Sequence, residues 1–355
     1  MSAAHRYDLR LQTLSPALLF TIGQIDEHKG RWAAGGQLNP QLLARLKRSV
    51  LVTSTGASTR IEGARLSDEE IEKMMRGLSI QKFAERDQQE VNGYFELLRN
   101  VFDSWATLSF TESTIRHFHQ ELLKYVEQDV LHRGDYKRNE NRVLMVDAAG
   151  ESIGVLFETT PAWQTPSAMS ELVTWTQGAL AAQQYHPLLV IGHFLVEFLA
   201  IHPFQDGNGR LSRILTNFLL LKSGYLYTPY VSHEKLIEDN KPDYYLALRT
   251  SQKTFQTESE DIQPWLAFFC QVLLVQARQA VALLTNEYLE KTLSRHQWTI
   301  WQYLQQVQEA TPQEIATATG IARPTVTQAL NRLLQLQRIE RLGQGRGVRY
   351  RVQES

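Results

Sequence analysis

The chain has 355 residues, enough for two or three domains, and its 43% hydrophobic and 21% charged residues are usual for a folded protein. A formal net charge of −1 argues against a protein that binds nucleic acid through an overall positive charge, although a basic region can lie within a neutral total. The one cysteine, Cys270, excludes a disulfide framework.

The first residues contain no apolar core of the kind that a signal peptide has. The most apolar run, residues 188–201, is interrupted by His193 and Glu197 and is shorter than the roughly 20 residues that cross a bilayer. We therefore expect a cytoplasmic protein without a membrane partner.

Helical patterns fill most of the chain. Apolar residues spaced three and four apart from about Asn39 predict a helix. Residues 54–63 read as a break followed by a short helix that Gly63 ends, and Ser67 opens another helix. Further amphipathic patterns predict helices over residues 87–102, 111–125, 167–182, 187–201, 210–223 and 265–289, the last as one or two helices.

Residues 142–157 differ from this pattern. Arg142–Asp147 and Ile153–Phe157 read as two short strands around a turn at Ala148-Ala149-Gly150, which predicts a β-hairpin. Pro161 and Pro166 separate this hairpin from the next helix.

The C-terminal region has the spacing of a helix-turn-helix. A short helix over 312–320 ends at a glycine, and a longer helix covers 323–333. Two strands follow, at 339–342 and 348–352, joined by a turn through Gly343, Gly345 and Gly347. Together these elements predict a winged-helix domain.

This domain is locally basic, because residues 295–355 contain eight arginines and four glutamates. One interpretation is DNA binding, with a recognition helix and a wing that present Arg323, Thr325, Thr327, Gln328 and Arg346. The other is a protein-docking or dimer module, since a fold alone does not establish a function.

A glycine-rich loop between two predicted helices forms a candidate anion site. One helix ends near Ile201, the loop runs from His202 to Gly209, and the next helix opens at Arg210. The N–H groups of Gly207, Asn208 and Gly209 would point into the space ahead of the helix N-terminus, where the helix dipole favours phosphate.

Four side chains complete this site. Arg210 and Arg213 lie three residues apart on one helix face, which suits a polyphosphate. Asp206 is the nearest carboxylate and could hold Mg²⁺, while His202 has a pKa suited to accepting a proton from a hydroxyl. This set of groups matches phosphoryl or nucleotidyl transfer.

The sequence HPFQDGNGRLSR at 202–213 resembles the signature of the Fic (Fido) family, H-P-F-x-[D/E]-G-N-G-R-x-x-R, and the resemblance covers roughly residues 42–274. It implies a mainly α protein, in which a Fic-type helical core carries a β-hairpin flap and a C-terminal winged helix-turn-helix domain follows. We expect four parts: an N-terminal helical region with an inhibitory helix over 1–100, a catalytic core over 101–274, a linking helix over 275–294 and the winged-helix domain over 295–355.

The resemblance also implies an activity, that of a protein adenylyltransferase using ATP and Mg²⁺. His202 would take a proton from a Ser, Thr or Tyr hydroxyl of a target protein or of the chain itself, and that oxygen would attack the α-phosphorus and expel pyrophosphate. The hairpin would position the target segment. The remaining roles implied are Mg²⁺ binding by Asp206, phosphate binding by Gly207, Asn208, Gly209, Arg210 and Arg213, and adenine contacts by Tyr244, Tyr245 and Gln252, the last standing where relatives often have Asn.

The segment from Ser58 to Gly63 resembles the family's inhibitory motif, [S/T]-x-x-x-E-[G/N]. By that resemblance Glu62 pairs with Arg213 and removes a γ-phosphate ligand, as a bidentate carboxylate competing with phosphate for one guanidinium. In some relatives the same glutamate orients a water that removes AMP, so the reverse reaction stays open.

Other interpretations remain open. The chain could be a DNA-binding regulator whose Fic core senses nucleotide, or it could transfer another group, such as phosphate or a different nucleotide. A zinc site is not expected, because His202 leaves the helix face that His186 and His193 could share and no H-E-x-x-H occurs. His117 and His119 read as structural, and a homodimer would be unsurprising.

Overall fold

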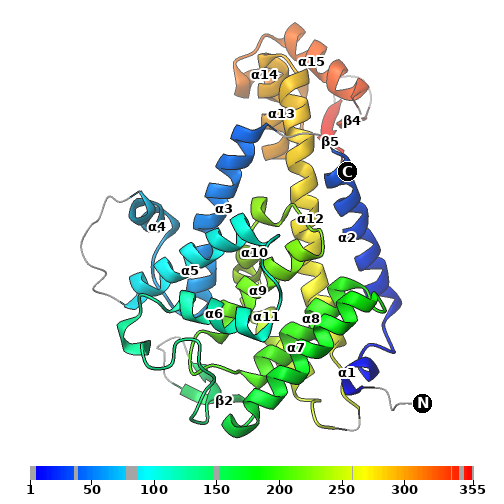
Figure 1. Cartoon of the computed structure of the whole chain (residues 1–355). Helices are drawn as coiled ribbons and strands as arrows, with labels where there is room; N and C mark the ends of the chain where they lie inside the picture. Colours follow the sequence, from blue (N-terminus) through cyan, green and yellow to red (C-terminus); the bar gives the residue numbers. More distant parts are fainter. Residues whose placement is uncertain are drawn as a thin grey trace. The chain divides into compact units, whose positions relative to one another are not determined.

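The computed structural model describes residues 5–35, 39–76, 86–146, 152–257, 259–336, 338–343 and 348–353. The chain divides into two compact units, Met1–Val281 and Ala282–Ser355. The first unit is mainly helical (Figure 1). Its helices are α1 (Arg6–Leu9), α2 (Pro16–Ala34), α3 (Pro40–Ile61), α4 (Asp68–Met75), α5 (Arg86–Ser104), α6 (Glu112–Leu122), α7 (Thr165–Ala182), α8 (Pro187–Ile201), α9 (Asn208–Lys222), α10 (His233–Asp239), α11 (Lys241–Gln252) and the start of α12 (Gln263–Thr292).

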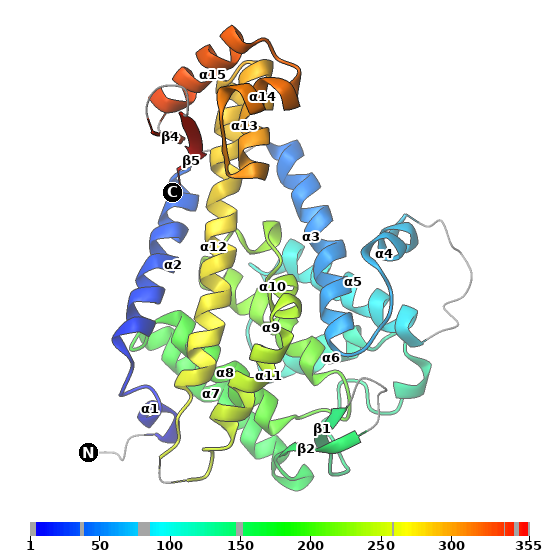
Figure 2. The same ribbon diagram turned by 180° about the vertical axis from the view of Figure 1, so that it is seen from behind.

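Helix α8 lies in the core of this unit and begins and ends where the sequence predicts. Its residues from Leu188 to Leu199 are all buried, as expected for a helix that is apolar on every face. It packs against α7 and α9, and Figures 1 and 2 show α7 and α8 side by side from opposite directions. The core therefore fixes both helices that flank the glycine-rich loop.

The break predicted at the start of residues 54–63 is wrong, because α3 continues without interruption from Pro40 to Ile61. The small residues from Ser54 to Ser58 are all buried, so they form a packing face that lets α3 lie close to α5 and α10. A Cβ atom on Gly56 would come within 2.4 Å of Asp68 Oδ1. Gly63 follows the helix end with φ of 106°, as predicted for a C-terminal stop.

The predicted hairpin is present as strands β1 (Arg142–Val146) and β2 (Ser152–Glu158), labelled in Figure 2. The strands pair antiparallel from Arg142 with Glu158 to Val146 with Ser152, with two irregularities in register. The predicted turn at Ala148-Ala149-Gly150 lies outside the described residues.

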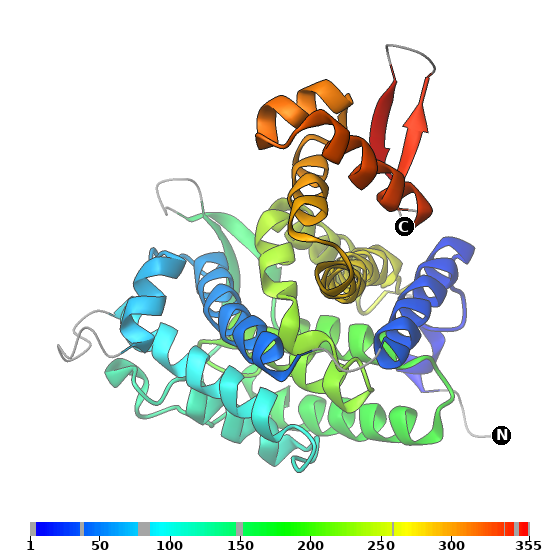
Figure 3. The same ribbon diagram turned by 90° about the horizontal axis from the view of Figure 1, so that it is seen from above.

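The second unit contains α13 (Arg295–Val307), β3 (Glu309–Ala310), α14 (Pro312–Thr319), α15 (Arg323–Gln335), β4 (Ile339–Leu342) and β5 (Arg349–Val352). Gly320, with φ of 69°, makes the turn between α14 and α15. Strands β4 and β5 pair antiparallel and lie side by side in Figure 3, which gives the order of a winged helix-turn-helix domain. The two-residue strand β3 pairs with β5 and was not predicted; Gly345, Arg346 and Gly347 lie outside the described residues.

The predicted linking helix is not a separate element. Residues 263–292 form the single helix α12, and the boundary between the two units, after Val281, falls within it. Within the described residues, Gln263–Leu284 is long and apolar enough to cross a membrane, but 56% of its most apolar window is buried inside the chain, as in ordinary core helices.

Candidate active site

The loop between α8 and α9 is bounded by two left-handed residues. His202 ends α8 with φ of 51° and ψ of 60°, and Gly207 precedes α9 with φ of 78°. Asn208 closes the loop on itself: its Oδ1 accepts from Phe204 N at 2.9 Å and its Nδ2 donates to Phe204 O at 2.8 Å. The side-chain amide of Asn208 is thus engaged within the loop, which leaves the backbone N–H groups at the start of α9 to face an anion.

His119, on α6, packs against the loop and donates a hydrogen bond to it. Its ring stacks on the fully buried Phe204, with centroids 3.8 Å apart and an interplanar angle of 10°. Its Nδ1 accepts from Gly134 N at 2.9 Å, so Nε2 carries the proton that is donated to Asp206 O at 3.0 Å. Burial lowers the pKa of His119 to about 4, which keeps this ring neutral. The structural role predicted for His119 therefore includes shaping the loop.

His202 is held as a neutral imidazole with one nitrogen oriented by the backbone. Its Nδ1 lies 3.3 Å from Leu199 O, and a carbonyl can only accept, so Nδ1 carries the proton and Nε2 carries the lone pair. Burial lowers the pKa of His202 to about 4, against the opposing effect of that hydrogen bond. At neutral pH the side chain can therefore accept a proton.

The loop opens into a cavity of about 420 Å³. The cavity brings together most of the predicted site residues, and further side chains that the sequence did not single out also line it. The predicted ones are Glu62, His202, Asp206, Gly207, Asn208, Gly209, Arg210, Tyr244 and Tyr245.

Arg210 is buried in a cluster of carboxylates. Its Nη1 lies 2.6 Å from Glu90 Oε2 and its Nη2 donates to Asp206 Oδ2 at 2.9 Å. Arg86 donates to the same Asp206 oxygen at 2.8 Å. Burial alone would raise the pKa of Asp206, but these arginines lower it below its ordinary value. Glu90 and Arg86 were missed because neither residue stands near the motif in the sequence.

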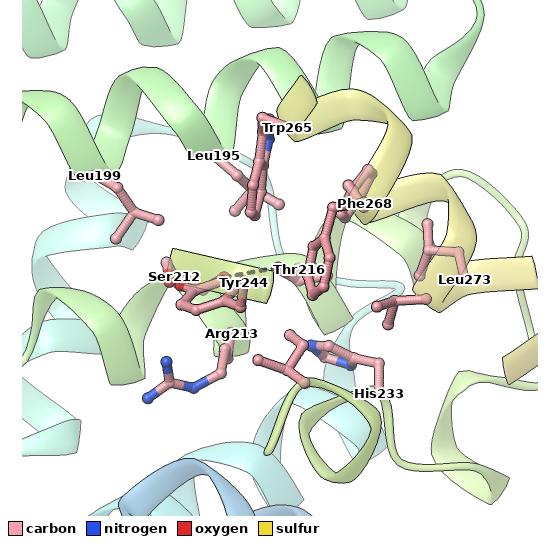
Figure 4. A pocket seen from close by; sticks show the side chains of 13 residues that line it. Leu195, Leu199, Ser212, Arg213, Thr216, His233, Tyr244, Trp265, Phe268 and Leu273 are labelled. Carbon is pink, nitrogen blue, oxygen red and sulfur yellow. Dashed lines mark hydrogen bonds between the residues drawn. The ribbon is translucent and has the colours of Figure 1, made fainter. Parts of the chain in front are cut away.

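Arg213 is buried and bonded to the segment that resembles the inhibitory motif. Its Nε donates to Ser58 Oγ at 2.7 Å, and its Nη2 donates to Ser58 O at 2.9 Å and to Glu62 Oε1 at 2.7 Å. The contact that the resemblance implies is present, although the expected bidentate geometry is wrong: one guanidinium nitrogen reaches one carboxylate oxygen. Figure 4 shows the Arg213 guanidinium pointing away from Trp265 and Phe268, which line a small apolar cavity of about 20 Å³ behind it.

Glu62 lies directly over the start of α9. A Cβ atom built on Gly209 would be 2.2 Å from Glu62 Oε1, so the glutamate occupies the space in front of the helix N-terminus. Its side chain remains 33% exposed because it borders the open cavity. Burial opposes its ionisation, but the charge of Arg213 and their hydrogen bond lower the pKa of Glu62 overall. The carboxylate thus takes the position that the sequence assigns to a phosphate.

The structure separates Gln252 from the rest of the predicted site. Its side chain donates to Val196 O at 3.3 Å and lines a different hollow, together with Arg6, Arg10 and Glu197. Tyr244 and Tyr245, both about two turns earlier on α11, do line the 420 Å³ cavity.

The donor set suits a magnesium ion that shares its ligands with phosphates. Asp206 keeps 39% of its side-chain exposure and faces the cavity beside the helix N-terminus. Within the part of the chain that the structure describes, no group of three or more His, Cys, Asp or Glu side chains is arranged around a metal position. A single carboxylate completed by phosphate oxygens and waters is a usual arrangement for Mg²⁺.

Residues 109–220, which include the loop and α9, match the model of the Fic/DOC family. The chain contains a Fic domain. A probable protein adenylyltransferase of Aquifex aeolicus is 33% identical over 84 residues, which cover 24% of this chain and 25% of that protein. The protein adenylyltransferase Fic of Drosophila persimilis is 25% identical over 201 residues, covering 56% of this chain and 31% of that protein. The matches thus span a third or less of these relatives' own length.

The fold is shared over a much longer stretch than the Fic domain itself. The crystal structure of a Fic family protein from Desulfovibrio desulfuricans covers 97% of this chain and 98% of its own, with a TM-score of 0.62 and 24% identity. That likeness supports the mainly α architecture around the Fic domain.

Proposed function

We propose that this chain transfers AMP from ATP to a hydroxyl group of a protein. The observation that carries this proposal is a neutral His202 in one cavity with the N-terminus of α9, Arg210 and a tyrosine pair. The curated relatives named above carry the name of protein adenylyltransferases, which favours AMP over other transferred groups.

In the reaction, the target hydroxyl approaches His202 Nε2 and gives up its proton there as its oxygen attacks the α-phosphorus. A new P–O bond to the target forms, and the bond between the α-phosphorus and the pyrophosphate oxygen breaks. The N–H groups of Gly207–Gly209 and the guanidinium of Arg210 bind the phosphates. Mg²⁺, held by Asp206, would neutralise charge on those phosphates.

Within the described residues β1 and β2 pair only with each other, and Asn141, which directly precedes β1, lines the cavity. We include in the proposal that a target segment binds to an edge of this sheet by strand addition. This arrangement would present a hydroxyl without requiring a fixed target sequence, because main-chain groups supply most of the hydrogen bonds.

The proposal includes an intramolecular inhibitor. Glu62 occupies the space in front of Gly209 and bonds Arg213, so ATP cannot place its terminal phosphates there while the glutamate stays. The occupied space at Gly209 and the engaged Arg213 both hinder binding of the triphosphate, and neither hinders binding of the adenine or of the target.

The test is incubation with ATP labelled at the α-phosphate. We expect Glu62→Gly to label protein faster than the wild-type chain, and the added change His202→Ala to lower that rate by about 100-fold or more, the usual contribution of a general base. His117→Ala, a change of an exposed histidine, is the control and should leave the rate unchanged. Label from γ-labelled ATP instead would show phosphate transfer and overturn the proposal.

DNA-binding regulation is the second candidate, and the exposed face of α15 favours it. Arg323, Thr327, Gln328 and Arg332 are all exposed on this helix. Sequence-specific DNA binding without any protein labelling in the Glu62→Gly variant would favour a regulator over a transferase.

A further inference from the structure

Five successive backbone carbonyls around the histidine are held by hydrogen bonds from one region of the chain, residues 137–160. Thr160 N donates to Ala200 O at 3.3 Å, and Lys137 N donates to Pro203 O at 2.8 Å. The side chains of Lys137 and Asn141 reach the other three carbonyls, those of Ile201, His202 and Phe204. The backbone on both sides of His202 is therefore fixed from one direction.

The side chain of Lys137 is at the centre of this contact. The residue is 4% exposed, and its Nζ donates to Ile201 O at 3.0 Å, Asn141 Oδ1 at 2.8 Å and Thr159 Oγ1 at 2.9 Å. All three partners are neutral oxygens, so the ammonium group is placed as a three-way donor rather than as half of an ion pair. Burial accordingly lowers the pKa of Lys137 to about 8.

Asn141 and Thr159 flank the open end of the hairpin, where its two strands begin and end. Asn141 directly precedes β1 and Thr159 directly follows β2. Asn141 Nδ2 donates to Phe204 O at 2.9 Å and to His202 O at 3.4 Å, while Thr159 Oγ1 donates to Asn141 O at 2.7 Å. The same group of contacts thus joins the hairpin to the His202 loop.

The backbone of His202 needs such support. Its φ of 51° lies in the left-handed region, which is strained for a residue with a side chain and persists only where the surroundings impose it. We propose that Lys137, acting through Asn141 and Thr159, is a positioning residue that holds His202 in this conformation and couples it to the hairpin. The catalytic meaning of this role rests on the proposed function.

The test that does not depend on activity is NMR of the imidazole of His202 in the nucleotide-free, full-length chain. In the wild-type chain we expect a pKa near 4, the value set by burial. Lys137→Met should release the loop, expose the ring and raise the pKa of His202 toward 6.5. The control Lys222→Met removes an exposed lysine and should leave it unchanged.

Loss of the Lys137 charge would also raise the pKa of His202, because that charge lowers it. Glu62 and Asp206 act in the opposite direction, and none of these charges changes in Asn141→Leu. Positioning predicts that Asn141→Leu raises the pKa of His202 as well and that Lys137→Arg restores it at least in part. A shift in Lys137→Met without any shift in Asn141→Leu would reduce the lysine to an electrostatic role and overturn the proposal. If either variant does not fold, Thr159→Val replaces it with the same expectation.

Kinetics provide the second arm, in the Glu62→Gly background. Lys137→Met should lower kcat by about 100-fold, the effect of a displaced general base. The KM for ATP should stay within about twofold, because the proposed ATP site lies at α9 and not at Lys137. If Glu62→Gly transfers no AMP but the NMR shifts occur, the proposed function fails and the positioning role stands. Unchanged NMR together with unchanged kcat overturns the positioning role alone.

Discussion

Glu62 reaches two parts of the proposed phosphate site, Arg213 through its charge and the space over Gly209 through its volume. Glu62→Gln keeps the volume and one acceptor oxygen but loses the charge, and charge-assisted hydrogen bonds are about twice as strong as neutral ones. We therefore expect AMP transfer by Glu62→Gln at a rate between those of the wild-type chain and Glu62→Gly. A rate equal to that of the wild-type chain would show that only the volume of the side chain inhibits. A rate equal to that of Glu62→Gly would show that only its charge inhibits.

The pH dependence of transfer should follow the lowered pKa of His202. Because burial lowers that pKa to about 4, the imidazole stays neutral, and able to accept a proton, well below the ordinary value of 6.5. The charge of Glu62 raises the pKa of His202, so removal of Glu62 lowers this pKa further. Initial rates of Glu62→Gly should stay level from about pH 7, where Lys137 is still charged, to about pH 5 and fall only near pH 4. A decline centred near pH 6.5 would mean that the ring is exposed to water.

Among the elements, α3 contacts the core one turn before the proposed inhibitory motif, on the same helix face. Ser54 Oγ donates to Glu234 Oε2 at 2.7 Å, and Ser54, Ser58 and Glu62 follow one another at intervals of four residues. Glu234 is fully buried on α10, and its other oxygen accepts from Asn217 Nδ2 of α9 at 2.6 Å. Since Asn217 lies one turn beyond Arg213, this carboxylate holds α3 and α9 in the register that brings Glu62 to Arg213.

Glu234→Gln should therefore weaken both folding and inhibition. The variant places an amide where the carboxylate now accepts from several donors, which leaves hydrogen bonds to a charged group unmade, each worth about 1.5–3 kcal/mol. We expect a loss of about 3 kcal/mol in the free energy of unfolding by urea and faster AMP transfer than in the wild-type chain. Glu171→Gln, at an exposed glutamate, should cost less than about 0.5 kcal/mol; an equal loss there would remove the special role of Glu234.

What the sequence could predict depended on distance along the chain. The residues from His202 to Arg213 are contiguous, so their roles could be inferred from spacing and from the resemblance. Lys137, Asn141 and Glu90 reach the loop from far away in the sequence, and nothing in their local pattern indicates it. The buried small residues of α3 read locally as a break, but close packing against neighbouring helices keeps them helical. Gln252 was assigned by analogy of position, and its side chain faces another hollow.

At the scale of the molecule, the second unit has a core of its own and a polar outer face. Ile300, Leu304, Ile315, Val326 and Leu330 are fully buried within it. Two of its basic side chains are paired within the unit: Arg349 Nε lies 2.5 Å from Glu309 Oε1, and Arg351 donates to Glu340. The net positive charge of this unit therefore falls more on α15 than on β5.

This distribution of charge makes DNA binding by the full-length chain a testable prediction. We expect binding to duplex DNA whose affinity falls with salt concentration, because phosphate contacts release counterions. Arg323, exposed at the start of α15, should contribute one such contact, so Arg323→Ala should weaken binding about tenfold and reduce the salt slope by about one. Arg138→Ala, which removes an arginine of the first unit with 84% side-chain exposure, controls for total charge and should change neither quantity. An equal response to Arg323→Ala and Arg138→Ala would mean that DNA is attracted by total charge and not bound at α15. Absence of DNA binding would favour a protein-docking role for α15, since a helix-turn-helix can serve either purpose.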